Sequence, residues 1–96
     1  MPSSRTVVTT QKASKYLQQL CKHFAHKVAV RYDLETAEVA FPFGACRMYA
    51  HDSFLSIECD ANSEDELRRA QNVIDDHLGR FAWREAPKII WKPVSI

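Results

Sequence analysis

The sequence predicts a single α+β domain in which one mostly antiparallel sheet carries two helices on the same face. The chain has 96 residues, which suits one domain spanning positions 1–96. Along it, the spacing of apolar residues is helical, then alternating, then helical again. The turns between the alternating segments are too short for the crossovers that parallel strands need, so these strands pair antiparallel. The predicted order of elements is β-α-β-β-β-β-α-β.

A β-branched stretch and an amphipathic helix open the chain. Residues 5–10 are expected to form an edge strand, because β-branched side chains fit a pleated surface. Apolar residues then recur every three or four positions, which is typical of one buried helix face. They are Ala13, Tyr16, Leu17, Leu20, Cys21, Phe24 and Val28. Thr10 is expected to cap this helix through its hydroxyl, and residues 1–4 are expected to be disordered.

Four strands joined by short turns are predicted between residues 28 and 60. In each of them apolar residues alternate with polar ones, as in a sheet that buries one face. The apolar positions are Val28, Val30, Tyr32, Val39, Phe41, Cys46, Met48, Ala50, Leu55, Ile57 and Cys59. Asp52-Ser53 is the expected turn of the last hairpin, and it places Cys46 opposite Cys59. The four segments therefore form an antiparallel meander.

A capping box marks the start of the second helix. Ser63 is followed three residues later by Glu66, so each side chain can bond the other residue's backbone. The buried stripe of this helix contains Leu67, Ala70, Val73, Ile74, Leu78 and Phe81. Pro87 prevents further extension. A last strand is predicted at residues 88–94, with Ile89 and Trp91 on one side.

The charge balance argues against a polyanionic partner. Thirteen Lys and Arg residues face twelve Asp and Glu residues, for a formal net charge of +1. Proteins that hold nucleic acid by its phosphates usually show a clustered basic excess, so no nucleic-acid partner is expected. No apolar run approaches the roughly 20 residues that cross a bilayer, and the N-terminus lacks a signal peptide's apolar stretch. A cytoplasmic protein that does not bind membranes is predicted.

The cysteines indicate a reducing compartment. The chain has three, Cys21, Cys46 and Cys59, with no paired spacing such as CxxC. A disulfide framework favours an even number, and a zinc ribbon favours close pairs. Reduced and buried thiols are therefore expected, with Cys46 and Cys59 packed as cross-strand neighbours.

No pattern in the sequence indicates an enzyme. With only two glycines the chain offers no phosphate-cradling loop. No serine lies in a nucleophile elbow, and the carboxylates clustered at residues 64–66 are explained by helix capping. A non-catalytic domain is predicted.

Three histidines, His23, His26 and His77, are candidate metal ligands. His23 and His26 are three apart on the first predicted helix and share a flank, and a third ligand has to come from elsewhere, such as His77. The alternative for the first two is a pair of solvated side chains beside a core Cys21, which lies ~140° from His26 around the helix axis. The alternative for His77 is a neutral core residue with one satisfied hydrogen bond.

The other face of the sheet is a candidate docking face. The predicted register places Arg31 opposite Glu38 and Arg47 opposite Glu58, and aromatic groups among such polar ones are typical of interfaces. The candidate docking residues are Arg31, Arg47, Tyr49, His51 and Phe54. The alternative is a solvated face with cross-strand ion pairs that stabilise it by ~0.2–1 kcal/mol each.

Three stretches of the sequence, YLQQLCKHFAHK (16–27), FPFG (41–44) and HLGRFAWRE (77–85), carry a resemblance to a known family. They resemble the bacterial domain-of-unknown-function family 2218, and the resemblance extends from about Arg5 to Trp91. Members of that family occur alone or beside siderophore-interacting flavoproteins, which release iron from its chelators, so the resemblance implies a link to iron handling. Gly79 departs from the pattern, and the second helix is expected to end earlier for that reason. The strand order is also similar to the TATA-binding-protein-like fold, a topological analogy that carries no function.

Two functions follow from these patterns. The first is a non-catalytic binding or accessory domain linked to iron–siderophore use, with a siderophore-interacting flavoprotein or a small ligand as partner and no cofactor. The alternative is a histidine-based metal or haem protein with a redox role, in which iron or haem is the cofactor. The oligomeric state is left open.

The sequence predicts that the protein does not bind DNA. The fold that it resembles grips the minor groove with its open sheet face, but here Glu38 and Glu58 stand beside Arg31 and Arg47, so few counterions are released. A gel shift on mixed-sequence duplex at low salt tests this. Micromolar binding that weakens steeply as salt is added contradicts the prediction.

Overall fold

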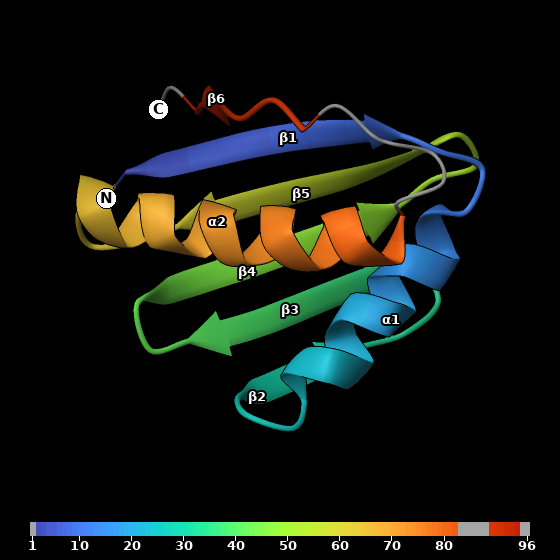
Figure 1. The fold of residues 1–96 in the computed structure, drawn as a ribbon, viewed down its shortest axis with the longest axis horizontal. Coiled ribbons are helices and arrows are strands. Elements are labelled where there is room, and N and C mark those ends of the chain that lie inside the picture. The colour runs from blue at the N-terminus through green and yellow to red at the C-terminus, as the bar shows by residue number, and fades with distance from the viewer. Residues whose placement is uncertain (1, 83–88, 95–96) are drawn as a thin grey trace.

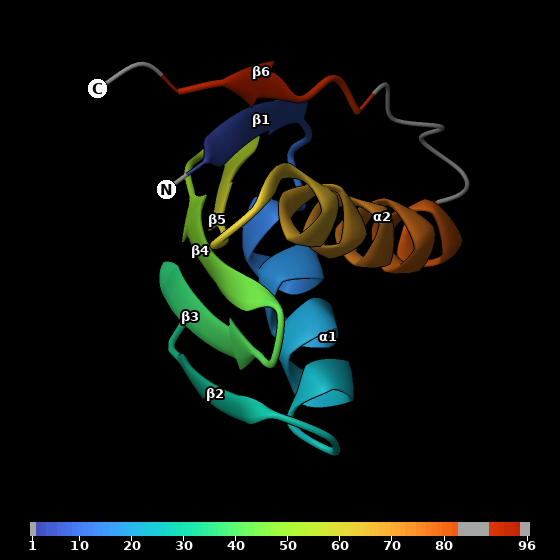
Figure 2. The same cartoon turned by 90° about the vertical axis from the view of Figure 1, so that its left-hand side faces the viewer.

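Six strands form a single sheet, and two helices cover one of its faces (Figures 1 and 2). The structure is a computed structural model that describes residues 2–82 and 89–94. The strands are β1 (Ser3–Thr9), β2 (Ala29–Tyr32), β3 (Thr36–Phe41), β4 (Gly44–Ala50), β5 (Phe54–Asp60) and β6 (Lys92–Pro93), and the helices are α1 (Ala13–Phe24) and α2 (Glu64–Phe81). The predicted fold class, element order and one-sided placement of the helices are confirmed.

The strand order in the sheet is β2-β3-β4-β5-β1-β6, and each neighbouring pair is antiparallel. The meander β2 to β5 is as predicted, and the N-terminal strand β1 lies between β5 and the short β6. The hairpin of β4 and β5 has the predicted register, with Cys46 opposite Cys59 and Met48 opposite Ile57. This register turns every second side chain of the meander toward the helices.

The core lies between the helices and the inward face of the sheet. Helix α1 packs over β2 to β5 and α2 over β4 and β5. The largest fully buried side chains come from both layers: Leu17, Leu20, Met48, Leu55, Ile57, Ile74 and Leu78. Burying each such side chain stabilises the fold by ~1.5–3 kcal/mol relative to leaving it exposed. No helix in the described part of the chain has the length and apolar character needed to span a membrane.

The start of α2 agrees with the prediction from the sequence, whereas the start of α1 does not. In α2, the Ser63 hydroxyl accepts the Glu66 backbone N–H (3.2 Å), as predicted, and donates to the Glu66 carboxylate. Helix α1 has Lys12 at its N-cap and no side-chain cap. The Thr10 hydroxyl accepts the Lys12 N–H at 3.0 Å, but Thr10 lies two residues before the N-cap and so does not cap the helix. The predicted cap was therefore wrong, although Thr10 does bind a backbone N–H.

Both ends of the sheet differ from the prediction. Strand β1 starts at Ser3, and Ser3 and Ser4 pair with β5 where disorder was expected. The last strand covers only Lys92–Pro93 of the predicted residues 88–94. These two residues are in register with β1, and the Val94 N–H donates to the Ser3 carbonyl at 3.0 Å; residue 88 lies outside the described residues. Just before β6, the Trp91 indole N–H donates to an Asp75 carboxylate oxygen at 2.7 Å and ties the segment to α2.

The second helix also continues past Gly79 to Phe81, so the predicted early end was wrong. A Cβ at Gly79 meets nothing within 4 Å. Helix packing upstream and downstream outweighs the entropic cost of one glycine, ~1 kcal/mol.

The two glycines are expected to respond oppositely to alanine. Gly79→Ala raises the free energy of unfolding by ~1 kcal/mol, since the site is open and helical. Gly44→Ala lowers the free energy of unfolding by ~1–3 kcal/mol, because a Cβ added at this position would lie 2.5 Å from the Asp60 carbonyl oxygen. Chemical denaturation of both variants measures the difference. Equal stability of the two contradicts the expectation.

Candidate functional site

A small hollow opens where the end of α1, the β3–β4 turn and the middle of α2 meet. Its volume is about 240 Å³. The lining residues are His23, Phe24, Lys27, Val28, Phe41, Pro42, Phe43, Val73 and His77. We call this hollow the histidine pocket. It lies on the helix side of the sheet, and residues far apart in the sequence contribute to it.

Two histidines from different helices meet at the histidine pocket. The ring centroids of His23 on α1 and His77 on α2 are 4.5 Å apart. The Nδ1 atom of His77 lies 2.7 Å from the Val73 carbonyl oxygen. Since a carbonyl only accepts hydrogen bonds, Nδ1 is the donor, and in neutral His77 the Nε2 atom carries a free lone pair. The one satisfied hydrogen bond predicted for this half-buried residue is present.

Aromatic rings form the wall of the histidine pocket. Phe41 ends β3 and Phe43 is the second residue of the two-residue β3–β4 turn, and their rings stack nearly parallel, with centroids 5.1 Å apart and planes 7° apart. The Phe24 ring stands edge-on to Phe41 at 5.2 Å and to His77 at 5.1 Å. Outside this wall, the Arg69 guanidinium lies 4.9 Å from the Phe43 ring centroid. Interlocked rings of this kind present a fixed apolar surface to whatever enters.

Positive groups dominate the electrostatics of the histidine pocket. Among the described lining residues Lys27 is a permanent cation, and none is acidic. Desolvation lowers the pKa of His23, and the charge of His77 is the next largest cause. Contributions of the same sign come from Lys27, His26 and Arg80. His23 is therefore neutral at neutral pH, and the permanent charge among the described lining residues is the cation of Lys27.

Of the three candidate metal ligands, the structure brings His23 and His77 together and leaves His26 outside the pocket lining. Helix α1 ends at Phe24, so His26 lies in the following turn as an exposed side chain. Within residues 2–82 and 89–94 no three His, Cys, Asp or Glu side chains are grouped as a metal site requires. A two-histidine metal site stays a prediction.

The thiols behave as packing groups. Cys21, Cys46 and Cys59 are free and buried, as expected. The Cys46 and Cys59 Sγ atoms face each other at 3.6 Å. The hydrogen bond with Cys59 and burial both raise the pKa of Cys46 well above its ordinary value, so its reactive thiolate is disfavoured.

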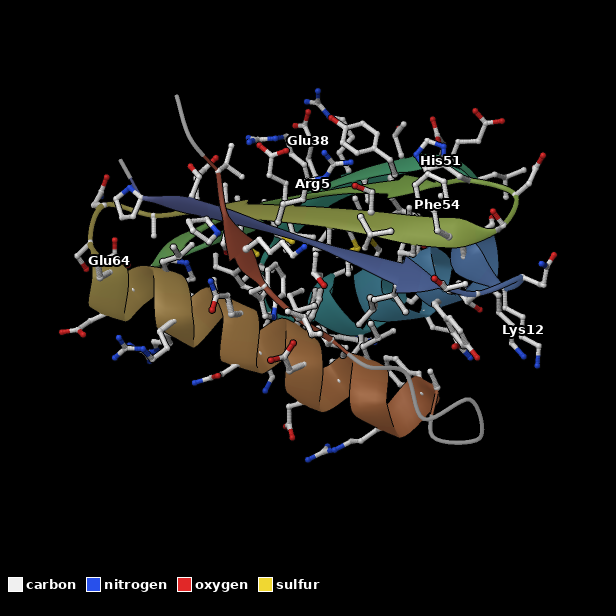
Figure 3. All side chains as sticks on the ribbon, turned by 90° about the horizontal axis from the view of Figure 1, so that it is seen from above. Arg5, Lys12, Glu38, His51, Phe54 and Glu64 are labelled. Atoms are coloured by element: carbon white, nitrogen blue, oxygen red, sulfur yellow. The ribbon has the colours of Figure 1, made fainter. Side chains whose placement is uncertain are left out.

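The face of the sheet opposite the helices carries a row of alternating charges (Figure 3). Neighbouring strands place the following residues side by side, in order across the sheet: Arg5, Glu58, Arg47, Glu38 and Arg31. Arg47 bonds Glu58 at 3.1 Å and Asp60 at 3.0 Å. The predicted cross-strand charge neighbours are therefore confirmed, and the centre of the row is neutralised by its own ion pairs.

The predicted docking residues Arg31, Arg47 and Tyr49 belong to outward positions of this same sheet face. His51 and Phe54 stack at one end of it, with centroids 4.2 Å apart (Figure 3). The structure thus groups the candidate docking residues on one face. Whether a partner docks there stays a prediction.

A known protein family and a solved structure are similar to this chain. The family described as "Uncharacterized protein conserved in bacteria (DUF2218)" matches residues 5–92. This chain belongs to the DUF2218 family. A solved relative of this DUF2218 chain, PA4090 from Pseudomonas aeruginosa, has an NMR structure that is similar over 100% of both chains, with 34% sequence identity and a TM-score of 0.84. No curated protein matches the chain.

The three stretches that carry the family resemblance converge on the histidine pocket. They supply all of its lining residues except Val28 and Val73. The sequence analysis placed Phe41 on the apolar face of a strand and gave Phe43 and Lys27 no role. The break at Pro42 was the available signal, because a tight turn takes the residue after the proline out of the strand.

The DUF2218 histidine pair makes a measurable prediction. By proton NMR, His23 is expected to titrate below its ordinary pKa of 6.5. Replacing His77 by Gln removes a neighbouring positive charge, so the pKa of His23 rises toward that value. His26→Gln is the matched control and moves it less, because His77 is the larger cause. An unchanged titration in the His77 variant contradicts the contact.

Proposed function

We propose that this DUF2218 chain is a non-catalytic binding domain that holds a small organic ligand in the histidine pocket. The observation that carries the proposal is the meeting of His23 and His77 against the aromatic wall of Phe24, Phe41 and Phe43. Ligand sites are typically concave and mostly apolar, with a few placed polar groups. The histidine pocket has this composition.

Unused polar atoms support the proposal. Within the described part of the chain, no hydrogen bond is recorded for the ring nitrogens of His23 or for Nε2 of His77. His23 is exposed and His77 is half-buried, so water serves these atoms in the free protein. A ligand with matching polar groups replaces that water, and the same atoms then fix its orientation.

The same residues argue against a nucleophile–histidine pair in the pocket. A Ser–His or Cys–His pair needs a hydroxyl or thiol beside the histidine. None of the described lining residues carries a hydroxyl, thiol or carboxylate. The site can position and retain a molecule, and binding is the function that this residue set supports best.

The proposal also includes a class of partner. The family resemblance implies iron–siderophore use, with a siderophore-interacting flavoprotein or a small ligand as partner, in the cytoplasm. The histidine-based metal or haem protein is a weaker candidate on this geometry. Two imidazoles provide two ligands, and a hollow of about 240 Å³ lies below the ~300–1,000 Å³ typical of drug-sized ligands, let alone a haem.

Chemical-shift mapping with a set of neutral, anionic and cationic single-ring fragments and one divalent metal ion tests the proposal. Amides of the pocket lining are expected to shift for at least one ring fragment. Shifts confined to the strands around Tyr49 on the outer face contradict the proposal and favour docking. Shifts of His23 and His77 with the metal ion alone favour the metal alternative.

A matched pair of aromatic variants sharpens this test. Phe43→Ala removes part of the wall and is expected to lower the affinity for the fragment by ~tenfold or more. Phe54→Ala removes a ring of similar exposure from the outer face and is expected to leave the affinity unchanged. Equal effects of the two variants contradict a site in the histidine pocket.

A further inference from the structure

We infer that the ligand of the histidine pocket is a one-ring aromatic carboxylate that also carries a hydroxyl group. The inference rests on the proposed function and adds the chemical class of the ligand. It follows from three properties of the site: the sign of its charge, its supply of hydrogen-bond donors and acceptors, and the size and shape of its wall.

The charge of the site is unbalanced in favour of anions. Lys27 lines the histidine pocket, and Arg69 lies against the outside of its wall. Twelve acidic residues are present in the chain, yet none is among the described residues of the lining.

The acids next to His77 in the sequence of α2 are engaged elsewhere. Asp75 accepts the Trp91 indole N–H at 2.7 Å, and Asp76 faces the Arg80 guanidinium at 3.4 Å. The ammonium of Lys27 therefore has no recorded carboxylate partner among the described residues. A carboxylate on the ligand can provide one, since charge-assisted hydrogen bonds are the stronger class.

The two imidazoles offer different groups to the ligand. Neutral His23 has one ring N–H without a recorded partner in the described chain, so it can donate to a carboxylate beside Lys27. Neutral His77 has spent its N–H on the Val73 carbonyl and presents only the Nε2 lone pair. The lone pair needs a donor, which a hydroxyl on the ring of the ligand supplies.

The wall limits the rest of the ligand. Phe41 and Phe43 present nearly parallel rings, and Phe24 stands edge-on to Phe41 at an interplanar angle of 80°. Flat rings stack on such surfaces in offset or edge-to-face arrangements. The volume of about 240 Å³ suits a single ring with small substituents. A benzoate bearing a hydroxyl meets all three requirements.

We test the inference by titrating the full chain with 3-hydroxybenzoate, benzoate, benzamide and benzamidine. Binding is measured from the amide chemical shifts of the pocket lining. Benzoate is expected to bind ~tenfold more tightly than the neutral, similarly shaped benzamide. The hydroxyl is expected to add a further ~threefold to tenfold, and the cationic benzamidine is expected to bind more weakly than benzamide.

Three variants assign these preferences to residues. Lys27→Gln is expected to remove the preference for benzoate over benzamide, whereas Lys22→Gln, near the end of α1 but outside the pocket lining, is expected to retain it. His77→Phe is expected to remove the gain from the hydroxyl and retain the preference for the carboxylate. Lys27 is exposed, so its variant tests the charge preference independently of any effect of His77→Phe on folding.

The outcomes separate the inference from the proposed function. Benzamide or benzamidine binding in the pocket as tightly as benzoate overturns the anion preference and leaves the binding function standing. A hydroxyl gain that survives in His77→Phe overturns the assignment to Nε2. If none of the four probes shifts the pocket while another fragment does, the ligand class is wrong and the binding function again stands. Pocket amides that respond to no fragment overturn both.

Discussion

The close approach of the Gly44 backbone to Asp60 is the constraint on which the candidate site depends. Only a residue without a Cβ lets β4 begin beside the carbonyl group at the end of β5. That contact sets the position of the β3–β4 turn relative to the rest of the sheet. The turn in turn holds Phe41 and Phe43 face to face. The aromatic wall of the histidine pocket is therefore positioned by backbone packing rather than by the side chains that form it.

The two faces of the sheet handle charge in opposite ways. On the outer face, Arg47 is neutralised by Glu58 and Asp60, within a row of alternating signs. Such half-exposed pairs contribute little stability but leave little net field. On the helix side, Lys27 sits at an apolar hollow without a recorded counter-charge among the described residues. Lys27 thus keeps its charge at a concave site, where an anionic group can approach it.

The sequence was sufficient for the fold and only partly sufficient for the site. The capping box at Ser63 and the alternation around Cys46 and Cys59 are local signals, and the structure follows both. The contact between His23 and His77 depends on how two helices pack, which periodicity along either one does not contain. For the same reason His26 was grouped with His23, although α1 ends between them. The last strand was overestimated because a β-branched apolar run indicates propensity but not how many of its residues pair with a neighbouring strand.

The position of β1 in the sheet affects how the protein folds during its synthesis. Residues 3–9 pair with residues 54–60, whereas each hairpin of the meander joins neighbours in the sequence. During synthesis, β1 leaves the ribosome before β5 and cannot pair until β5 has emerged. Closing so long a loop carries an entropic penalty that the hairpins avoid. Until it closes, one edge of β5 is open, so the nascent chain is most vulnerable to pairing with another chain just before β1 pairs with β5.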